Sequence, residues 1–260
     1  MGYSTLTYQV AGQVATIALT VPEKRNAISG QMVADLIAAL TQAESSSVRA
    51  MILTGSGKAF CAGMDLDELQ LLGKSTLQKN LEDARRVSKL FYRLYSFPKP
   101  VIAAVNGAAI AGGCGLATLA DFTLAVPEAK FGYPEVKLGF MPALVAVFLR
   151  RQIGEKHARD LLLTGRIIEA AEAYRIGLIT EIVASERLMD RAHELAGMLM
   201  AVSPTAVART KKFLLDFDDT AIRAELDAAI DANANIRATP DFHEGIASFL
   251  EKRAPKWSGN

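Results

Sequence analysis

Several residue types are scarce in this chain of 260 residues, and each shortage narrows the class of protein. The chain has only two cysteines, Cys61 and Cys114, which argues against a disulfide framework and favours an intracellular protein with reduced thiols. Its three histidines, His157, His193 and His243, lie in expected helical segments without the spacing of a metal site. We therefore expect neither a disulfide-stabilised secreted fold nor a metal centre.

An excess of one charge and long apolar runs are also missing. A net charge of +1 gives no long-range field for nucleic acid or an anionic membrane. No stretch approaches the roughly twenty apolar residues that span a bilayer, and the N-terminal residues alternate like a hairpin instead of forming a signal peptide. With 50% hydrophobic and 22% charged residues, the composition predicts a globular, cytoplasmic protein with no nucleic-acid or membrane partner.

Apolar periodicity predicts a mixed α/β chain. Strand, small-residue corner and helix recur near residues 50–70 and 101–120, whereas the C-terminal part is helical and poor in strand patterns. We expect a core over residues 1–200 and a helical region over residues 201–260. Other expected elements are a hairpin (Leu6–Val10 and Val14–Leu19), a helix capped by Ser29, a strand at Ala50–Thr54, an amphipathic helix over Leu81–Leu94, helices at Ala143–Gln152 and Glu155–Leu163, and a helix capped by Ser203.

The stretch Val101–Pro142 carries the strongest functional pattern. Its apolar start predicts a buried strand, and Gly112-Gly113 then removes two side chains, so backbone N–H groups there can approach a ligand closely. Cys114–Asp121 predicts a helix whose dipole would favour an anion. Glu135 follows among apolar neighbours that would raise its pKa. A backbone corner that can stabilise an anion and one carboxylate together predict a catalytic site.

Four motifs in this order resemble the crotonase family, also called the enoyl-CoA hydratase/isomerase family, from about Val14 to Lys252. They are Lys24-Arg25-Asn26-Ala27, the segment from Phe60 to Leu66, Asn106-Gly107 with Gly112-Gly113-Cys114, and the segment from Tyr133 to Gly139. The resemblance implies an α/β fold of the crotonase type, a spiral of ββα repeats with a C-terminal helical trimerisation region. It also implies a homotrimer or dimer of trimers that acts on an acyl-CoA thioester, with coenzyme A as part of the substrate and no other cofactor.

The resemblance assigns roles to particular positions. The N–H groups of Met64 and Gly112 would form an oxyanion hole for the thioester oxygen, and Glu135 would be the catalytic glutamate. The positions that match CoA-binding residues are Lys24, Arg25, Ala27, Ala62, Phe249 and Lys252. We also expect an acyl pocket that includes Gly115, Tyr133 and Phe140, with no metal.

Three positions depart from the pattern of the two-glutamate hydratases. Gly115 stands where those enzymes carry a second glutamate, Ala143–Ala146 replaces a glycine-rich segment, and Asp67 replaces a frequent lysine. Branches with one glutamate include enoyl-CoA isomerases and some hydratases of branched or aromatic substrates. The segment Gly139–Ala143 is more similar to the branched-chain hydratases, such as methylglutaconyl-CoA hydratase.

We therefore expect an enzyme that adds water to the double bond of a 2-enoyl-CoA, with a branched, methylglutaconyl-like acyl group as one candidate. An isomerase that moves the double bond between the delta3 and delta2 positions, with Glu135 as proton shuttle, is the first alternative. A non-catalytic scaffold or RNA-binding relative is the second, although Arg150-Arg151 and Arg209–Lys212 are short and lack interleaved aromatic residues. A cysteine or serine hydrolase is disfavoured because no histidine stands in a motif with such a nucleophile.

Plainer explanations exist for several of these residues. Gly112-Gly113 could serve only close packing of helix on sheet. Glu135 could pair with a nearby lysine at a strand end, and Lys24 and Arg25 could form a solvated loop.

Overall fold

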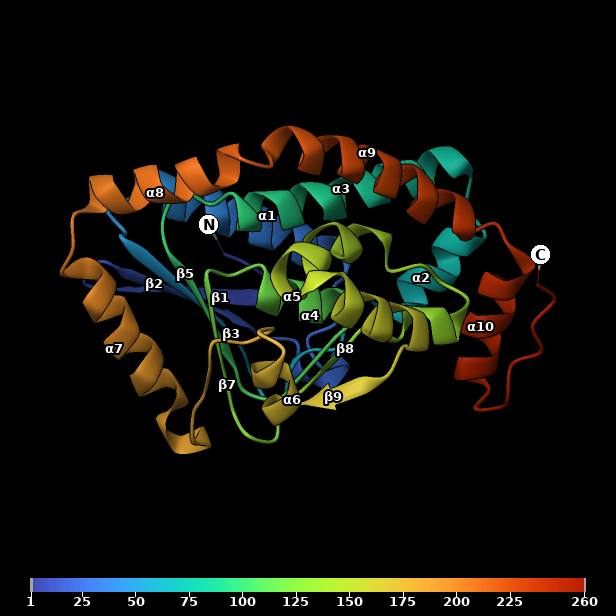
Figure 1. The fold of residues 1–260 in the computed structure, drawn as a ribbon. Coiled ribbons are helices and arrows are strands. Elements are labelled where there is room, and N and C mark those ends of the chain that lie inside the picture. Colours follow the sequence, from blue (N-terminus) through green and yellow to red (C-terminus); the bar gives the residue numbers. More distant parts are fainter. Residues whose placement is uncertain (1, 260) are drawn as a thin grey trace.

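The computed structural model describes residues 2–259 and shows two β-sheets surrounded by helices (Figure 1). The strands are β1 (Leu6–Ala11), β2 (Val14–Leu19), β3 (Ala50–Gly55), β4 (Ala59–Cys61), β5 (Val101–Val105), β6 (Ala108–Ile110), β7 (Phe122–Ala125), β8 (Lys130–Gly132), β9 (Ile167–Glu169) and β10 (Glu181–Ile182). The larger sheet has the order β1-β2-β3-β5-β7-β10, and the smaller has the order β4-β6-β8-β9. Neighbouring strands are parallel except in the β1–β2 hairpin and the β8–β9 pair.

Consecutive strands alternate between the two sheets, and this alternation generates a spiral. Strands β3, β5 and β7 of the larger sheet are each followed by a strand of the smaller sheet, β4, β6 and β8, and then by helical structure. The smaller-sheet strands have only three residues each, too few to show periodicity in the sequence. The arrangement confirms the expected spiral of ββα repeats.

The helices begin and end close to the expected positions. They are α1 (Gly30–Ser45), α2 (Leu66–Gly73), α3 (Leu77–Tyr95), α4 (Gly112–Thr118), α5 (Ala143–Thr164), α6 (Ala170–Arg175), α7 (Leu188–Met200), α8 (Pro204–Asp216), α9 (Asp219–Ile236) and α10 (Pro240–Leu250), with 3-10 turns η1 (Pro22–Lys24), η2 (Pro134–Leu138) and η3 (Ser185–Arg187). Within residues 2–259, no helix is long and apolar enough to cross a bilayer.

Local signals account for several of these boundaries. The Ser29 hydroxyl accepts a hydrogen bond from the Met32 N–H at 3.2 Å, as expected of an N-cap. The helix expected at Cys114–Asp121 is present as α4, but it begins earlier, at Gly112, and ends earlier, at Thr118. Gly154, at φ 74°, breaks α5 between the two helices that the sequence predicts there.

The helical C-terminal region packs against the spiral. Helix α9 runs along α3 and α5, as Figure 1 shows near its upper edge. Ile222, Leu226 and Ile230 of α9 belong to the same hydrophobic core as the larger sheet. The division at residue 200 stays a prediction, but the core runs without interruption across it.

Candidate active site

The two glycine corners of the sequence lie side by side at the end of the smaller sheet. Strands β4 and β6 pair in parallel, and each leads into one corner. A Cβ on Gly63 would lie 3.6 Å from the Gly112 nitrogen, and one on Gly113 would lie 2.2 Å from the Cys61 carbonyl oxygen. Gly113 is therefore required for close packing, and this packing holds the two corners together.

The backbone at the second corner is strained. Ala111 has φ 54° and ψ −127°, a conformation that residues with a Cβ rarely adopt. Gly112 follows as the first residue of α4, so its N–H has no acceptor within that helix. Met64 is the matching residue of the first corner, next to Gly63 at φ +91°. The geometry leaves a backbone N–H available beside a cavity.

Glu135 lies in the short turn η2 and is buried, with 7% of its surface exposed. Its Oε2 has no hydrogen-bond partner among residues 2–259, so pairing with a nearby lysine does not explain it. Burial raises the pKa of Glu135 from 4.5 to about 8, against the opposing effect of a hydrogen bond to its own backbone. The carboxyl group can therefore hold or release a proton near neutral pH.

Two cavities meet at this carboxyl group. The outer one has a volume of about 520 Å³ and the inner one of about 30 Å³. Met64, Gly112, Glu135 and Phe140 line both, so they stand at the junction. The structure thus brings the expected catalytic residues to one place.

The outer cavity contains most of the expected CoA-binding positions. Lys24 donates to Asp65 at 2.7 Å, and this hydrogen bond raises its pKa. Asp65 also accepts from the Asp67 N–H at 2.9 Å and so caps α2. Lys252 is exposed and does not line either cavity. The expected positions that do line the outer cavity are Lys24, Arg25, Ala27, Ala62 and Phe249.

Asn26 holds this loop in place, a role that the sequence did not reveal. It is fully buried, and its Nδ2 lies within 3.1 Å of the carbonyl oxygens of Ser56, Ala59 and Phe60. Its Oδ1 accepts from the Val21 N–H at 2.9 Å. The signal that could have revealed this role was a polar, uncharged side chain inside a motif whose neighbours are charged.

Of the three expected acyl-pocket residues, Phe140 lines the outer and the inner cavity. Tyr133 lies in the core, with its hydroxyl 3.4 Å from that of Thr118. A Cβ on Gly115 would lie 2.8 Å from Val145 Cγ1, so the space above Gly115 is already filled. The places of Tyr133 and Gly115 in an acyl pocket stay predictions.

The inner cavity also contains two polar residues from the C-terminal region that the sequence reasoning missed. Asn233 and Arg237 line it, and both are buried. They stand four positions apart beside Ile230 and Ala234, two buried apolar residues of α9. Polar residues at helical spacing beside apolar residues were the signal that could have found them.

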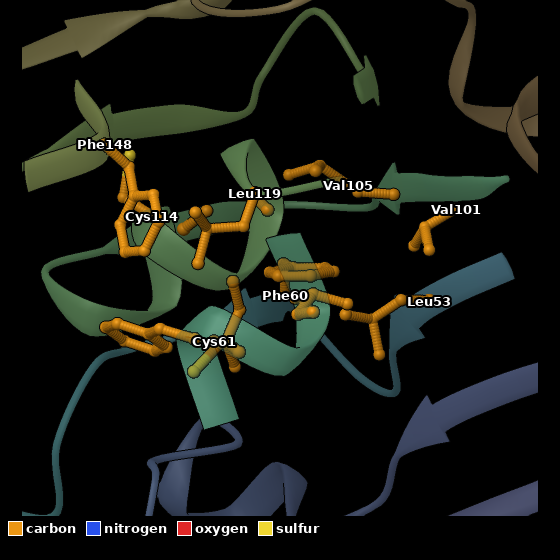
Figure 2. Close-up of a cluster of buried hydrophobic side chains, with 14 of the residues drawn as sticks. Leu53, Phe60, Cys61, Val101, Val105, Cys114, Leu119 and Phe148 are labelled. Atoms are coloured by element: carbon orange, nitrogen blue, oxygen red, sulfur yellow. The ribbon is translucent and has the colours of Figure 1, made fainter. Parts of the chain in front are cut away.

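The two cysteines are part of the hydrophobic core. Figure 2 shows Cys61 and Cys114 among apolar side chains that include Phe60 and Phe148. Burial raises the pKa of each thiol to about 12, so neither forms the thiolate that a nucleophile requires. The structure gives no support to a cysteine nucleophile.

Comparison with known proteins agrees with this geometry. The model of the family described as enoyl-CoA hydratase/isomerase matches residues 9–260. A Thermus thermophilus protein with an enoyl-CoA hydratase assignment is 43% identical, over 95% of this chain and 98% of that protein. The 2,3-dehydroadipyl-CoA hydratase of Escherichia coli is 35% identical, over 95% and 96%.

A solved structure shows the same fold. It is an enoyl-CoA hydratase/isomerase from Xanthobacter autotrophicus, with a TM-score of 0.90 and 30% identity over 96% of this chain and 94% of that one. The match to the family model covers nearly the whole sequence, as the motifs predicted. This chain belongs to the enoyl-CoA hydratase/isomerase, or crotonase, family.

Proposed function

We propose that the protein adds water across the double bond of a 2-enoyl-CoA thioester. The observation that carries this proposal is the buried, unpartnered carboxyl oxygen of Glu135 at the junction of two cavities that Met64 and Gly112 also line. Membership of the family and the hydratase names of similar proteins support hydration as the reaction class.

The outer cavity would hold the coenzyme A part of the substrate. Its volume of about 520 Å³ falls within the usual range of small-molecule sites. Arg25 is exposed at this cavity and forms no ion pair within residues 2–259, so it is free to contact a phosphate. The charge of Lys24 is already compensated by Asp65. We assign Arg25 the larger share of phosphate binding.

The reaction needs one group that moves a proton and one that stabilises negative charge. The ionised Glu135 takes a proton from water as the water oxygen bonds to the β-carbon of the enoyl group. The electrons of the double bond move toward the thioester oxygen, which accepts hydrogen bonds from the Met64 and Gly112 N–H groups. Protonated Glu135 then delivers its proton to the α-carbon, which completes the addition of one water.

A second candidate function is migration of the double bond. Within residues 2–259, Glu135 is the one carboxylate that lines the inner cavity. Migration of the double bond adds no water, so one carboxylate that carries a proton from one carbon to another is sufficient for it. The branched, methylglutaconyl-like substrate stays a prediction within the hydration proposal.

Product identification separates these functions. We would incubate the protein with linear 2-enoyl, 3-enoyl and branched glutaconyl CoA thioesters and determine product masses. Hydration adds the mass of water, whereas isomerisation leaves the mass unchanged.

The variant Glu135→Gln removes the base while preserving its shape. We expect its kcat to fall by about 10²–10⁴-fold with thioester binding largely retained. Near-normal turnover in this variant would exclude Glu135 from the mechanism.

A further inference from the structure

The inner cavity contains a buried cation that the proposed proton transfers do not use. Arg237 follows the last turn of α9, and 2% of its surface is exposed. It lines the same cavity as Glu135. Its guanidinium group lies over the ring of Phe140, 5.7 Å from the ring centroid. A guanidinium group is thus held beside the cavity that adjoins Glu135.

Two of the three guanidinium nitrogens have protein acceptors. Nη1 donates to Asp83 Oδ2 and Nη2 to Asn233 Oδ1, both at 2.8 Å. Nε is buried and has no partner among residues 2–259. Buried polar groups are nearly always hydrogen-bonded, so this donor requires an explanation.

A structural role accounts for only part of the arrangement. The ion pair of Arg237 with Asp83 connects the end of α9 to α3 and so holds these two helices together. This ion pair occupies Nη1, and Nη2 donates its hydrogen bond to Asn233. It leaves the Nε–H without an acceptor in a residue that lines a cavity. A ligand oxygen in the cavity could accept the hydrogen bond that the Nε–H has to donate.

Hydrogen-bonding capacity and size narrow the chemistry of that ligand. Asp83 also accepts from the exposed Arg86 at 3.4 Å, so two cations share one carboxylate. Within the cavity, Arg237 is balanced by Asp83, and Glu135 lines the same space, so the free Nε–H selects an acceptor oxygen and charge does not select an anion. The inner cavity of about 30 Å³ admits only a small group, so only the far end of an acyl chain would enter it, with the double bond at the junction with the outer cavity.

We propose that Arg237 determines acyl specificity, by donating an Nε–H hydrogen bond to an oxygen on the far end of a short acyl group. The preferred substrates are short 2-enoyl-CoA thioesters that carry an acceptor oxygen beyond the double bond. This inference rests on the proposed function, since it places the far end of the acyl group in the inner cavity.

Wild-type protein tests the substrate class. We would measure kcat/KM for 2-enoyl-CoA thioesters of equal, short chain length that end in a methyl, a hydroxyl or a carboxylate group. A hydrogen bond to a charged donor leads us to expect at least about a 10-fold preference for an oxygen-ended thioester over the methyl-ended one. A preference limited to the carboxylate identifies an anion, and an equal preference for the hydroxyl identifies a neutral acceptor. Equal or better turnover of the methyl-ended thioester would overturn the proposal.

Two arginine variants test whether Arg237 is the source of this preference. Arg237→Lys keeps a cation for Asp83 but removes the Nε–H, and we expect the ratio between oxygen-ended and methyl-ended thioesters to fall close to one. Arg86→Lys is the matched control, because Arg86 contacts the same carboxylate but does not line the cavity. It should keep the wild-type ratio. A preference retained in Arg237→Lys, or lost equally in both variants, would contradict the assignment.

A binding measurement separates this inference from the proposed function and does not depend on whether Arg237→Lys folds. Saturated acyl-CoA thioesters with the same three ends cannot be hydrated, so calorimetry on the wild-type protein reports recognition alone. Tighter binding of the carboxylate-ended or hydroxyl-ended compound without any hydratase activity would support the site and refute hydration. Equal affinities for all three would refute the site.

Discussion

At the scale of single residues, the carboxyl group of Glu135 is the most informative feature. Burial favours its protonated form, and Oε2 has no hydrogen-bond partner among residues 2–259. A general base is most effective when its pKa lies near the working pH. The burial that would destabilise an ionised side chain elsewhere therefore suits the proposed role.

The pH dependence of the reaction follows from this pKa. Hydration requires the ionised form of Glu135, whose pKa lies at about 8 in the free protein. We expect kcat/KM to rise with pH up to about that value and then to level off, measured with a fixed enoyl-CoA in buffers of constant ionic strength. A profile that stays flat across this range would show that ionisation of Glu135 does not limit the reaction.

The contribution of Glu135 to the free energy of unfolding should fall as pH rises, opposite to the rise of kcat/KM. Below pH 4.5 the carboxyl group is protonated in both the folded and the unfolded chain and contributes no pH dependence. Between pH 4.5 and about 8 the unfolded chain releases this proton more readily, so the free energy of unfolding falls as pH rises. Glu135→Gln should remove this part of the dependence in urea titrations.

Gly115 provides a second prediction at the residue scale. Its Cβ would lie 2.8 Å from Val145 Cγ1, and Val145 lines the inner cavity. We expect Gly115→Ala to lower the free energy of unfolding by about 1–3 kcal/mol through overpacking and to lower kcat/KM for every enoyl-CoA. The double variant Gly115→Ala with Val145→Ala should recover part of the loss. Gly197→Ala is a suitable control, because a Cβ there meets nothing within 4 Å.

At the scale of secondary structure, the turn that carries Glu135 is held against α10. A Cβ on Gly139 would lie 2.2 Å from the Asp241 carbonyl oxygen, and one on Gly245 would lie 2.2 Å from Leu138. The rings of Phe140 and Phe242 pack beside this contact, 5.5 Å apart. Backbone-to-backbone packing thus connects the C-terminal region to the position of the carboxylate.

A single methyl group at this contact should displace the turn. We expect Gly245→Ala to reduce kcat more than KM, because the shift moves Glu135 relative to the bound thioester. The free energy of unfolding should fall by about 1–3 kcal/mol. Steady-state kinetics at saturating substrate would measure the effect on kcat, with Gly197→Ala again as the control. A Gly245→Ala protein with unchanged kcat would show that α10 does not position the base.

At the scale of the whole molecule, α8 presents an exposed apolar surface. Phe213, Leu214 and Phe217 are each more than 60% exposed, and the two phenylalanine rings lie 4.7 Å apart. Exposed aromatic clusters of this kind are typical of protein–protein contacts. The trimer or dimer of trimers that the family resemblance implies would give this surface a partner.

Substitutions on α8 test that assembly. We expect light scattering to report a trimer or hexamer for the wild-type protein. The double variant Phe213→Ser with Phe217→Ser should shift the mass toward the monomer, because it removes apolar surface from the contact. Val10→Ser, at an exposed apolar position on strand β1, is the control and should keep the wild-type mass. An unaltered mass in the double variant would place the contact elsewhere.

Local sequence patterns were sufficient to predict many of the elements of this fold. Ser29 caps its helix as expected, and the small residues around Gly63 and Gly112 form the corners that the sequence predicts. Such features depend on neighbours within a few residues, so their physical cause is visible in the chain itself. The order of the motifs was also enough to identify the family, which the family model confirms.

Tertiary structure alone decided what surrounds the carboxylate. Asp83 and Arg237 stand 154 positions apart, yet they form a buried ion pair beside the inner cavity. The surroundings of Gly115 depend on the same kind of packing, since Val145 of another helix lies where a side chain at this position would be. The shape and charge of the cavity depend on which distant helices pack together, and no local periodicity encodes that choice.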